Sequence, residues 1–228
     1  GGGFFPVARG GPRAGGPRAR GGWARCGAAR AAPTPAARHS DLSEYSMDER
    51  MHGSPFFHAT NIPNAPGTNL VQIGIGGWTG SKEGLKVARE RESTVITIDD
   101  VDRFGVERVV EHALEVAWRN AKAVWISFDV DSVDPAFTPG TGTPMPGGLL
   151  PREVFRMIRD IAREGLVGME VVEVSPPYDV ADNTALVGVH AILDCLSSLV
   201  TAGKLGRLRP PPEERDDQVL APDRRAKG

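Results

Sequence analysis

Residues 125–135 read Trp-Ile-Ser-Phe-Asp-Val-Asp-Ser-Val-Asp-Pro, and the first half of this stretch predicts a buried strand because it is rich in β-branched and aromatic residues. Asp129 and Asp131 follow at its carboxyl end. In an extended strand both side chains point to the same face. Neighbouring carboxylates repel each other unless a cation lies between them, and open α/β sheets place their sites at this edge. The stretch therefore favours a hard-metal site; the alternative is a turn in which the carboxylates accept hydrogen bonds from backbone N–H groups.

Strand-like and helix-like segments alternate on both sides of this stretch, which predicts an α/β domain with a parallel, doubly wound sheet. The other predicted strands are 69–75, 94–98 and 167–174, and the predicted helices are 82–91, 105–120, 151–163 and 182–202. No apolar run approaches the roughly 20 residues that span a bilayer. No Gly-x-Gly-x-x-Gly opens a helix after a strand, so a nucleotide site is not indicated.

The composition of the 228 residues is that of an ordinary soluble protein, with 40% hydrophobic and 25% charged residues. A net charge of −2 gives no argument for a nucleic-acid or membrane partner. The two cysteines, Cys26 and Cys195, are too few for a disulfide framework and favour a reducing compartment. The expected location is therefore the cytoplasm, or an organelle matrix if the first residues form a transit peptide.

Residues 1–38 differ from the rest of the chain, because they contain seven arginines among Gly, Ala and Pro but no Asp, Glu or Lys. This composition predicts a disordered leader, a transit peptide or a segment foreign to the fold. Proline and charge after residue 203 predict a disordered tail over 204–228. The expected domain therefore covers residues 39–203.

Further candidate site residues lie on either side of the central stretch. If extended, His39 and Asp41 present an imidazole and a carboxylate to one face, a pair that suits manganese, nickel, iron or zinc better than calcium. Glu173 lies near the carboxyl end of a predicted strand and can bind a cation through charge-assisted hydrogen bonds. His52, in a loop, can pass a proton to a leaving group. The ordinary alternatives are a polar junction at 39–41, an ion pair of Glu173 with an arginine, and an exposed His52.

Three motifs together resemble the ureohydrolases, the family of arginase, agmatinase and related guanidino hydrolases. They are Ser-Phe-Asp-Val-Asp-Ser-Val-Asp-Pro at 127–135, Pro-Gly-Thr-Gly-Thr-Pro at 139–144 and Glu-Val-Ser-Pro at 173–176. The resemblance covers roughly residues 37–203. It implies a three-layer arginase-like α/β fold, a homo-oligomer (trimer or hexamer), and two divalent metal ions, manganese or nickel, that lower the pKa of bound water.

The resemblance also implies a reaction and a role for each candidate residue. A small guanidino substrate would be hydrolysed to urea and an amine or ammonia. Glu173 would bind the guanidinium and His52 would transfer a proton. The metal ligands implied by the resemblance are His39, Asp41, Asp129 and Asp131. Segments 57–66, 74–78 and 168–179 are similar to nickel-dependent guanidine hydrolases, whereas Thr143 is closer to the agmatinases, so guanidine and agmatine are both candidate substrates.

Two departures from the family pattern concern the first metal. The motif Asp-x-His-x-Asp has Ala37 in place of its first residue, which is a bridging ligand, and the upstream Gly-Gly-Asp-His segment is absent. The N-terminal strands of the sheet are then expected to be missing too. Because losing even an outer partner of a metal ligand costs about 10–100-fold in affinity or activity, we expect weak binding of two metals and little activity. A non-catalytic subunit with the same fold and the product of a broken gene are the alternatives.

Overall fold

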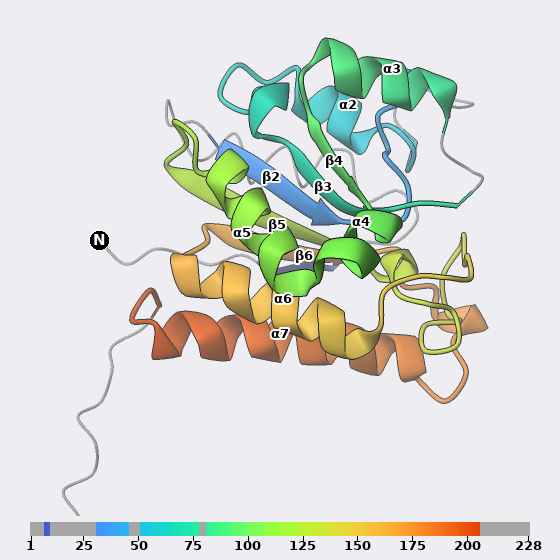
Figure 1. Cartoon of the computed structure of the whole chain (residues 1–228). Coiled ribbons are helices and arrows are strands. Elements are labelled where there is room, and N and C mark those ends of the chain that lie inside the picture. The colour runs from blue at the N-terminus through green and yellow to red at the C-terminus, as the bar shows by residue number, and fades with distance from the viewer. Residues whose placement is uncertain (1–6, 10–30, 46–50, 78–80, 206–228) are drawn as a thin grey trace, which may run out of the picture.

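The structure is a computed structural model that describes residues 7–9, 31–45, 51–77 and 81–205 (Figure 1). A six-stranded sheet lies at its centre, in the order β1-β6-β5-β2-β3-β4, and every pair of neighbouring strands in it is parallel. The strands are β1 (Val7–Arg9), β2 (Ala31–Ala36), β3 (Val71–Ile75), β4 (Thr94–Thr97), β5 (Ala123–Asp129) and β6 (Gly168–Val172). The predicted α/β class with a parallel sheet is confirmed.

Helices cover both faces of the sheet, so the described part of the chain has three layers (Figure 1). The helices are α2 (Pro55–Ala59), α3 (Lys82–Glu90), α4 (Ile98–Phe104), α5 (Val106–Ala117), α6 (Pro151–Glu164) and α7 (Asn183–Thr201), with short 3₁₀ turns η1 (Gly67–Asn69), η2 (Val130–Ser132) and η3 (Pro176–Tyr178). The three-layer arrangement implied by the resemblance is therefore present.

The central strand β5 contributes to the hydrophobic cores on both faces of the sheet. Val124, Ile126 and Phe128 point to the larger core, which α4 to α7 cover. Trp125 points to the smaller core, which includes side chains of α2 and α3. All seven residues of β5 are buried, which explains why its sequence is a continuous apolar run rather than an alternating one.

β2 is the main departure from the sequence prediction, which placed residues 1–38 outside the fold. Ala31–Ala36 pairs with β5 along six residues and lies between β5 and β3. Its Ala, Pro and Thr residues form no apolar pattern of the kind that predicts a strand. β1 and β2 both precede residue 39 and belong to the sheet, so these two N-terminal strands, which the sequence analysis did not expect, are present. The leader prediction for 1–6 and 10–30, like the tail prediction for 206–228, lies outside the described residues.

Two prolines interrupt the hydrogen-bond ladder on the β3 side of β2. Backbone N–H groups alternate between the two sides of a strand, and Ala37 donates to the Ile73 carbonyl of β3 at 3.0 Å. Pro33 and Pro35 precede Ala37 by even numbers of residues, so they face the same side but have no N–H to donate. The β2–β3 pairing is accordingly confined to Ala36 opposite Ile73, whereas the β2–β5 pairing is continuous.

The last helix, α7, is longer and more apolar than the sequence analysis allowed for. It is long and apolar enough, by length and composition, to be a candidate membrane span, and no other helix of the described residues meets these criteria. The prediction that no run approaches this length is therefore wrong. The core helix of a soluble protein meets the same criteria, so this finding alone does not indicate a membrane.

Candidate active site

The candidate residues from the sequence come together in one cavity of about 230 Å³. It lies at the carboxyl ends of β2, β5 and β6, where parallel sheets place their sites. The lining residues predicted from the sequence are His39, Asp41, His52, Asp129, Asp131 and Glu173. Those not predicted to lie there are Ser40, Ser43, Gly53, Ser81 and Thr143.

Asp129 and Asp131 converge through a turn rather than through an extended strand. β5 ends at Asp129, and Asp131 belongs to η2. The backbone N–H of Asp131 donates to Oδ1 of Asp129 at 2.9 Å, which is the turn that the sequence left open as the alternative. The predicted extended geometry is therefore wrong, yet both side chains line the cavity and are only 4% and 1% exposed.

Asp131 is the most heavily contacted acid of the site. Its Oδ2 lies 2.9 Å from Nδ1 of His39 and accepts a hydrogen bond from the Thr143 hydroxyl at 2.8 Å. Its Oδ1 accepts the backbone N–H of Arg38 at 3.2 Å. Burial acts to raise the pKa of Asp131, but the hydrogen bonds from His39 and Thr143 keep that pKa below its ordinary value. Asp131 is therefore negatively charged at neutral pH.

The pKa values of the other acids of the cavity are shifted in the opposite direction, above their ordinary values. Burial raises the pKa of Asp129, and the charges of Asp131, Asp41 and Glu173 raise it further. Burial is also the main reason why the pKa of Asp41 is raised, and repulsion from the charges of Asp131 and Glu173 raises it further. For Glu173 burial raises the pKa, while His52 partly offsets the shift. A cation in the cavity would stabilise the ionised forms of all these acids.

Two of these acids have backbone conformations that most residues avoid. Asp41 has a φ of 47° and Glu173 a φ of 62°, in the left-handed region that costs about 1–3 kcal/mol for residues other than glycine. Hydrogen bonds fix the first of these segments. The Asp41 carbonyl accepts the backbone N–H of Phe56 at 3.1 Å, and the Gln72 amide donates to the Ser40 carbonyl at 2.6 Å. These hydrogen bonds therefore hold the strained backbone that places the Asp41 carboxylate in the cavity.

The side chains that line the cavity are of the types that bind divalent metals, but their positions suit an ion only in part. Imidazole and carboxylate ligands suit manganese and nickel, and Nε2 of His39 is buried without a hydrogen-bond partner. However, within the described ranges no three His, Cys, Asp or Glu side chains are placed to enclose an ion. Ala37 lines a smaller cavity with Asp41 and Asp129 and has no donor atom there.

Comparison with known proteins gives consistent matches. The model described as the arginase family matches residues 37–197. Guanidinopropionase of Pseudomonas aeruginosa is 39% identical over 163 residues, covering 71% of this chain and 51% of that protein. Agmatinase of Proteus mirabilis is 39% identical over 145 residues, covering 64% of this chain and 44% of that protein.

A solved structure has the same arrangement of elements. Proclavaminate amidino hydrolase of Streptomyces clavuligerus superposes with a TM-score of 0.76 at 32% identity, covering 86% of this chain and 64% of that chain. The chain spans about half the length of the curated relatives it matches.

Proposed function

The chain belongs to the arginase family, and from this premise we propose that its cavity serves the metal-dependent hydrolysis of a guanidino compound to urea and an amine or ammonia. The observation that carries the proposal is the convergence of the six predicted residues on one cavity at the ends of three strands. The names of the relatives, guanidinopropionase and agmatinase, support guanidino compounds as the substrate class. We propose guanidine or agmatine as the substrate, in the cytoplasm or an organelle matrix.

Four residues would bind two divalent ions, manganese or nickel. They are His39, Asp41, Asp129 and Asp131. Bound ions lower the pKa of water enough to make hydroxide available near neutral pH. Thr143 keeps the Asp131 carboxylate in position through its hydrogen bond of 2.8 Å. Burial raises the pKa values of Asp41 and Asp129, and bound ions would act in the opposite direction, because these ligands bind as carboxylates.

The substrate is oriented by groups of the chain on the cavity wall. Glu173 presents a partly buried carboxylate, which can bind a guanidinium through two parallel charge-assisted hydrogen bonds. The positive substrate would also favour the ionised form of this acid. His52 is exposed at the cavity rim, where it can protonate the leaving nitrogen while remaining in contact with solvent.

The same site supports a second candidate function, a non-catalytic subunit of the arginase fold. Ala37 is the observation in its favour, because it provides no carboxylate beside Asp41 and Asp129. A bridging carboxylate contributes both a ligand and a negative charge that offsets repulsion between two ions. The chain as it stands is therefore expected to bind two ions weakly and to turn over slowly.

The test compares the natural chain with Ala37→Asp. Each protein is loaded with manganese or nickel, its metal content is measured, and urea and ammonia are assayed with guanidine, agmatine, arginine and guanidino acids. We expect Ala37→Asp to raise the metal content, the rise in Tm on metal addition, and the turnover. Ala136→Asp, at an exposed position, is the matched control and should change none of them.

The outcomes separate the two functions. Two tightly bound ions per natural chain would contradict the expected weak binding. If Ala37→Asp binds two ions and still hydrolyses none of the substrates, the hydrolase proposal fails and the non-catalytic subunit is favoured.

A further inference from the structure

Two segments that supply groups to the candidate active site lie next to each other at the carboxyl edge of the sheet. Residues 139–148 lie between η2 and α6, and the hydroxyl of Thr143 within them donates to Asp131 at 2.8 Å. Residues 173–179 follow β6 and begin with Glu173. We call the first the Thr143 loop and the second the Glu173 segment. Figure 1 shows both near the start of α7, at the right-hand end of that helix.

The two segments are joined directly through their backbones. Thr141 and Val174 form an antiparallel bridge, and the backbone N–H of Ser175 donates to the Gly140 carbonyl at 2.8 Å. The segments also approach closely, because a Cβ atom at residue 140 would lie only 2.5 Å from the Cβ atom of Asp179, a distance that glycine alone allows. The Thr143 loop therefore cannot leave the Glu173 segment without breaking these contacts.

The first turn of α7 holds both segments at once. Thr184 is completely buried, at 0% exposure, and its hydroxyl accepts the backbone N–H of Gly140 at 2.8 Å. The backbone N–H groups of Thr184 and Ala185 donate to the two carboxylate oxygens of Asp179, each at 2.9 Å. Burial acts to raise the pKa of Asp179, but these hydrogen bonds keep that pKa below its ordinary value. We call Thr184 and Asp179 the joint.

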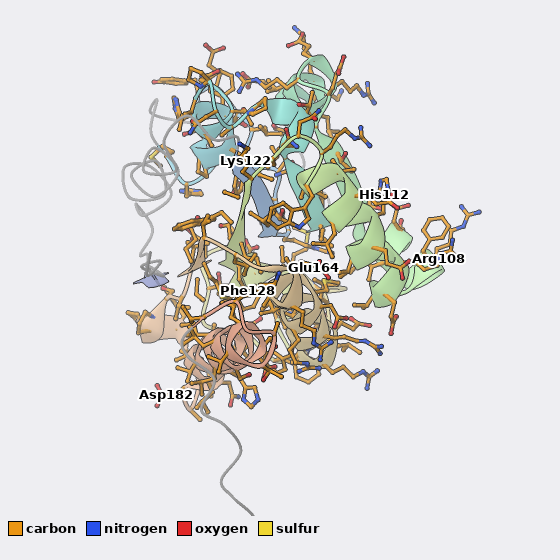
Figure 2. All side chains as sticks on the ribbon, turned by 90° about the vertical axis from the view of Figure 1, so that its left-hand side faces the viewer. Arg108, His112, Lys122, Phe128, Glu164 and Asp182 are labelled. Carbon is orange, nitrogen blue, oxygen red and sulfur yellow. The ribbon has the colours of Figure 1, made fainter. Side chains whose placement is uncertain are left out.

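The joint differs from an ordinary helix cap. An N-cap residue normally accepts hydrogen bonds from the N–H groups of the first turn through its own side chain. The residue directly before α7 is Asp182 (Figure 2), which has a φ of 58° and makes no such hydrogen bond. Asp179, three residues earlier, accepts them instead. The start of α7 is therefore held by a residue of the Glu173 segment.

We propose that Thr184 and Asp179 are positioning residues for the candidate active site. Neither lines the cavity, so both act through other residues. Through the Thr143 loop they fix the hydroxyl that holds the Asp131 carboxylate, and through the Glu173 segment they fix the carboxylate that faces the substrate. Ion binding and guanidinium binding then depend on the same joint. The inference rests on the proposed function, because it states how two parts of that site are kept together.

Single replacements separate the joint from the groups that it holds. Thr143→Val removes the hydroxyl beside Asp131 and should weaken mainly ion binding. Glu173→Gln removes the charge that attracts a guanidinium and should weaken mainly substrate binding. Thr184→Val removes the hydroxyl that accepts from Gly140 and should weaken both. Loss of an outer partner of a metal ligand costs about 10–100-fold in affinity, and for this more distant group we expect about 10-fold.

The binding measurements use Ala37→Asp as the parent, because that chain is expected to bind ions more tightly. Manganese affinity is measured by electron paramagnetic resonance of the free ion. Agmatine affinity is measured by calorimetry on the metal-free protein, so that hydrolysis does not interfere. Thr184→Val should lower both affinities about 10-fold, and Thr184→Ser, which keeps the hydroxyl, should retain the affinities of the parent. Equal losses in the two variants would overturn the role of the hydroxyl.

Thr97→Val is the matched control for damage to the start of a helix. The Thr97 hydroxyl accepts the backbone N–H of Asp100 at 3.2 Å in the first turn of α4, and Thr97 does not line the cavity. Thr97→Val should lower Tm as Thr184→Val does, yet leave both affinities unchanged. Should Thr184→Val fail to fold by circular dichroism, Asp179→Asn takes its place with the same expected losses, since it removes the charge that accepts from α7.

Hydrogen exchange tests the joint without any ligand. In Thr184→Val the backbone amides of the Thr143 loop and of the Glu173 segment should exchange faster together, whereas Thr97→Val should change neither. Gly140→Ala crowds Asp179 instead of removing a hydrogen bond, and it should have the same effect as Thr184→Val. Faster exchange in only one of the two segments would overturn the joint.

The outcomes keep the joint and the proposed function apart. If Ala37→Asp binds neither manganese nor agmatine, the proposed function fails, and the exchange result alone decides whether the joint exists. If Ala37→Asp binds both and Thr184→Val binds them equally well, the proposed function stands and the positioning role is overturned.

Discussion

Arg38 and Glu170 are buried charged groups close to the candidate site, and their surroundings differ. Arg38 is 3% exposed; its Nη2 donates to the Pro146 carbonyl at 3.0 Å, while Nε and Nη1 have no hydrogen-bond partner. Glu170 is 4% exposed. Burial raises its pKa to about 7, although hydrogen bonds from Ser127 and Trp125 act in the opposite direction. Both residues affect stability through the cost of burying charge.

Replacing Arg38 with methionine should stabilise the metal-free protein. Arg38→Met keeps most of the side-chain volume and removes a buried charge with two unsatisfied nitrogens. We expect the free energy of unfolding to rise by about 1–3 kcal/mol, measured by urea denaturation. Arg152→Met, at an exposed position of α6, is the control and should change it little. A loss of stability in Arg38→Met would show that the guanidinium makes favourable interactions.

Glu170 should make the stability of the protein depend on pH. Its folded-state pKa of about 7 lies above the ordinary value of 4.5, so the folded state binds the proton more tightly than the unfolded state. Its contribution to stability is therefore fully present below pH 4.5 and is lost as the pH rises to about 7. The total loss is up to about 3 kcal/mol.

The variant Glu170→Gln should not show this loss. Compared with the natural chain, its free energy of unfolding should be similar near pH 4.5 and higher at pH 8. Denaturation curves across this range measure the difference. Glu164→Gln, exposed at the end of α6 (Figure 2), should follow the natural chain. Parallel profiles for Glu170→Gln and the natural chain would contradict the raised pKa.

At the scale of elements, β2 shows where sequence patterns stop being informative. Helices α5 and α6 were predictable because their apolar residues repeat at helical spacing, and α7 because it is a long, largely apolar segment. β2 has the sequence Ala-Ala-Pro-Thr-Pro-Ala, which lacks a strand pattern, and the sequence analysis therefore assigned it to the leader. Its extended form results from the strands on either side, because tertiary context overrides the weak preference of the segment itself.

Replacing the two prolines of β2 should strengthen its pairing with β3. Pro33→Val/Pro35→Val restores two N–H groups on the β3 side of β2. In the register set by Ala37 and Ile73, residue 35 lies opposite Val71 of β3 and can form a ladder hydrogen bond worth about 1 kcal/mol, whereas residue 33 lies opposite Asn69 of η1. Part of this gain is offset because the unfolded chain becomes more flexible. We expect a rise in Tm and slower hydrogen exchange in β3. Pro151→Val, which removes a proline well placed at the start of α6, is the control and should not raise Tm.

The residues of the candidate site that belong to short motifs could be predicted from the sequence. The pairs 39/41 and 129/131 and the strand end at Glu173 indicated which side chains would converge. The contact of Thr143 with Asp131 and that of Ser43 with Ser81 at 3.2 Å join separate loops. Such contacts depend on how the loops fold over the sheet, and no local pattern specifies them.

One strand, β5, contributes side chains to both hydrophobic cores. Phe128 is fully buried in the larger core, and Trp125, three residues earlier on β5, is buried in the smaller core. Figure 2 shows Phe128 in the interior of the molecule. The helices on the two faces are therefore expected to lose their support together when β5 is weakened.

Phe128→Ala tests this coupling. The deletion leaves a cavity in the larger core and should lower the free energy of unfolding by about 3–5 kcal/mol. Hydrogen exchange should become faster in both α6 and α3, although α3 lies on the opposite face. Phe137→Ala, at a side chain that is 42% exposed, is the control. Faster exchange in α6 with none in α3 would show that the layers unfold separately.

The left-handed backbone of Asp41 and Glu173 has an evolutionary consequence. Glycine occupies this region without strain, so replacing either acid with glycine would relieve strain and remove a repelling carboxylate at once. Mutations selected only for a stable fold would therefore be favoured at these two positions. Stability and chemistry favour different residues there, and a lineage that no longer needed the reaction would lose these acids while keeping the fold.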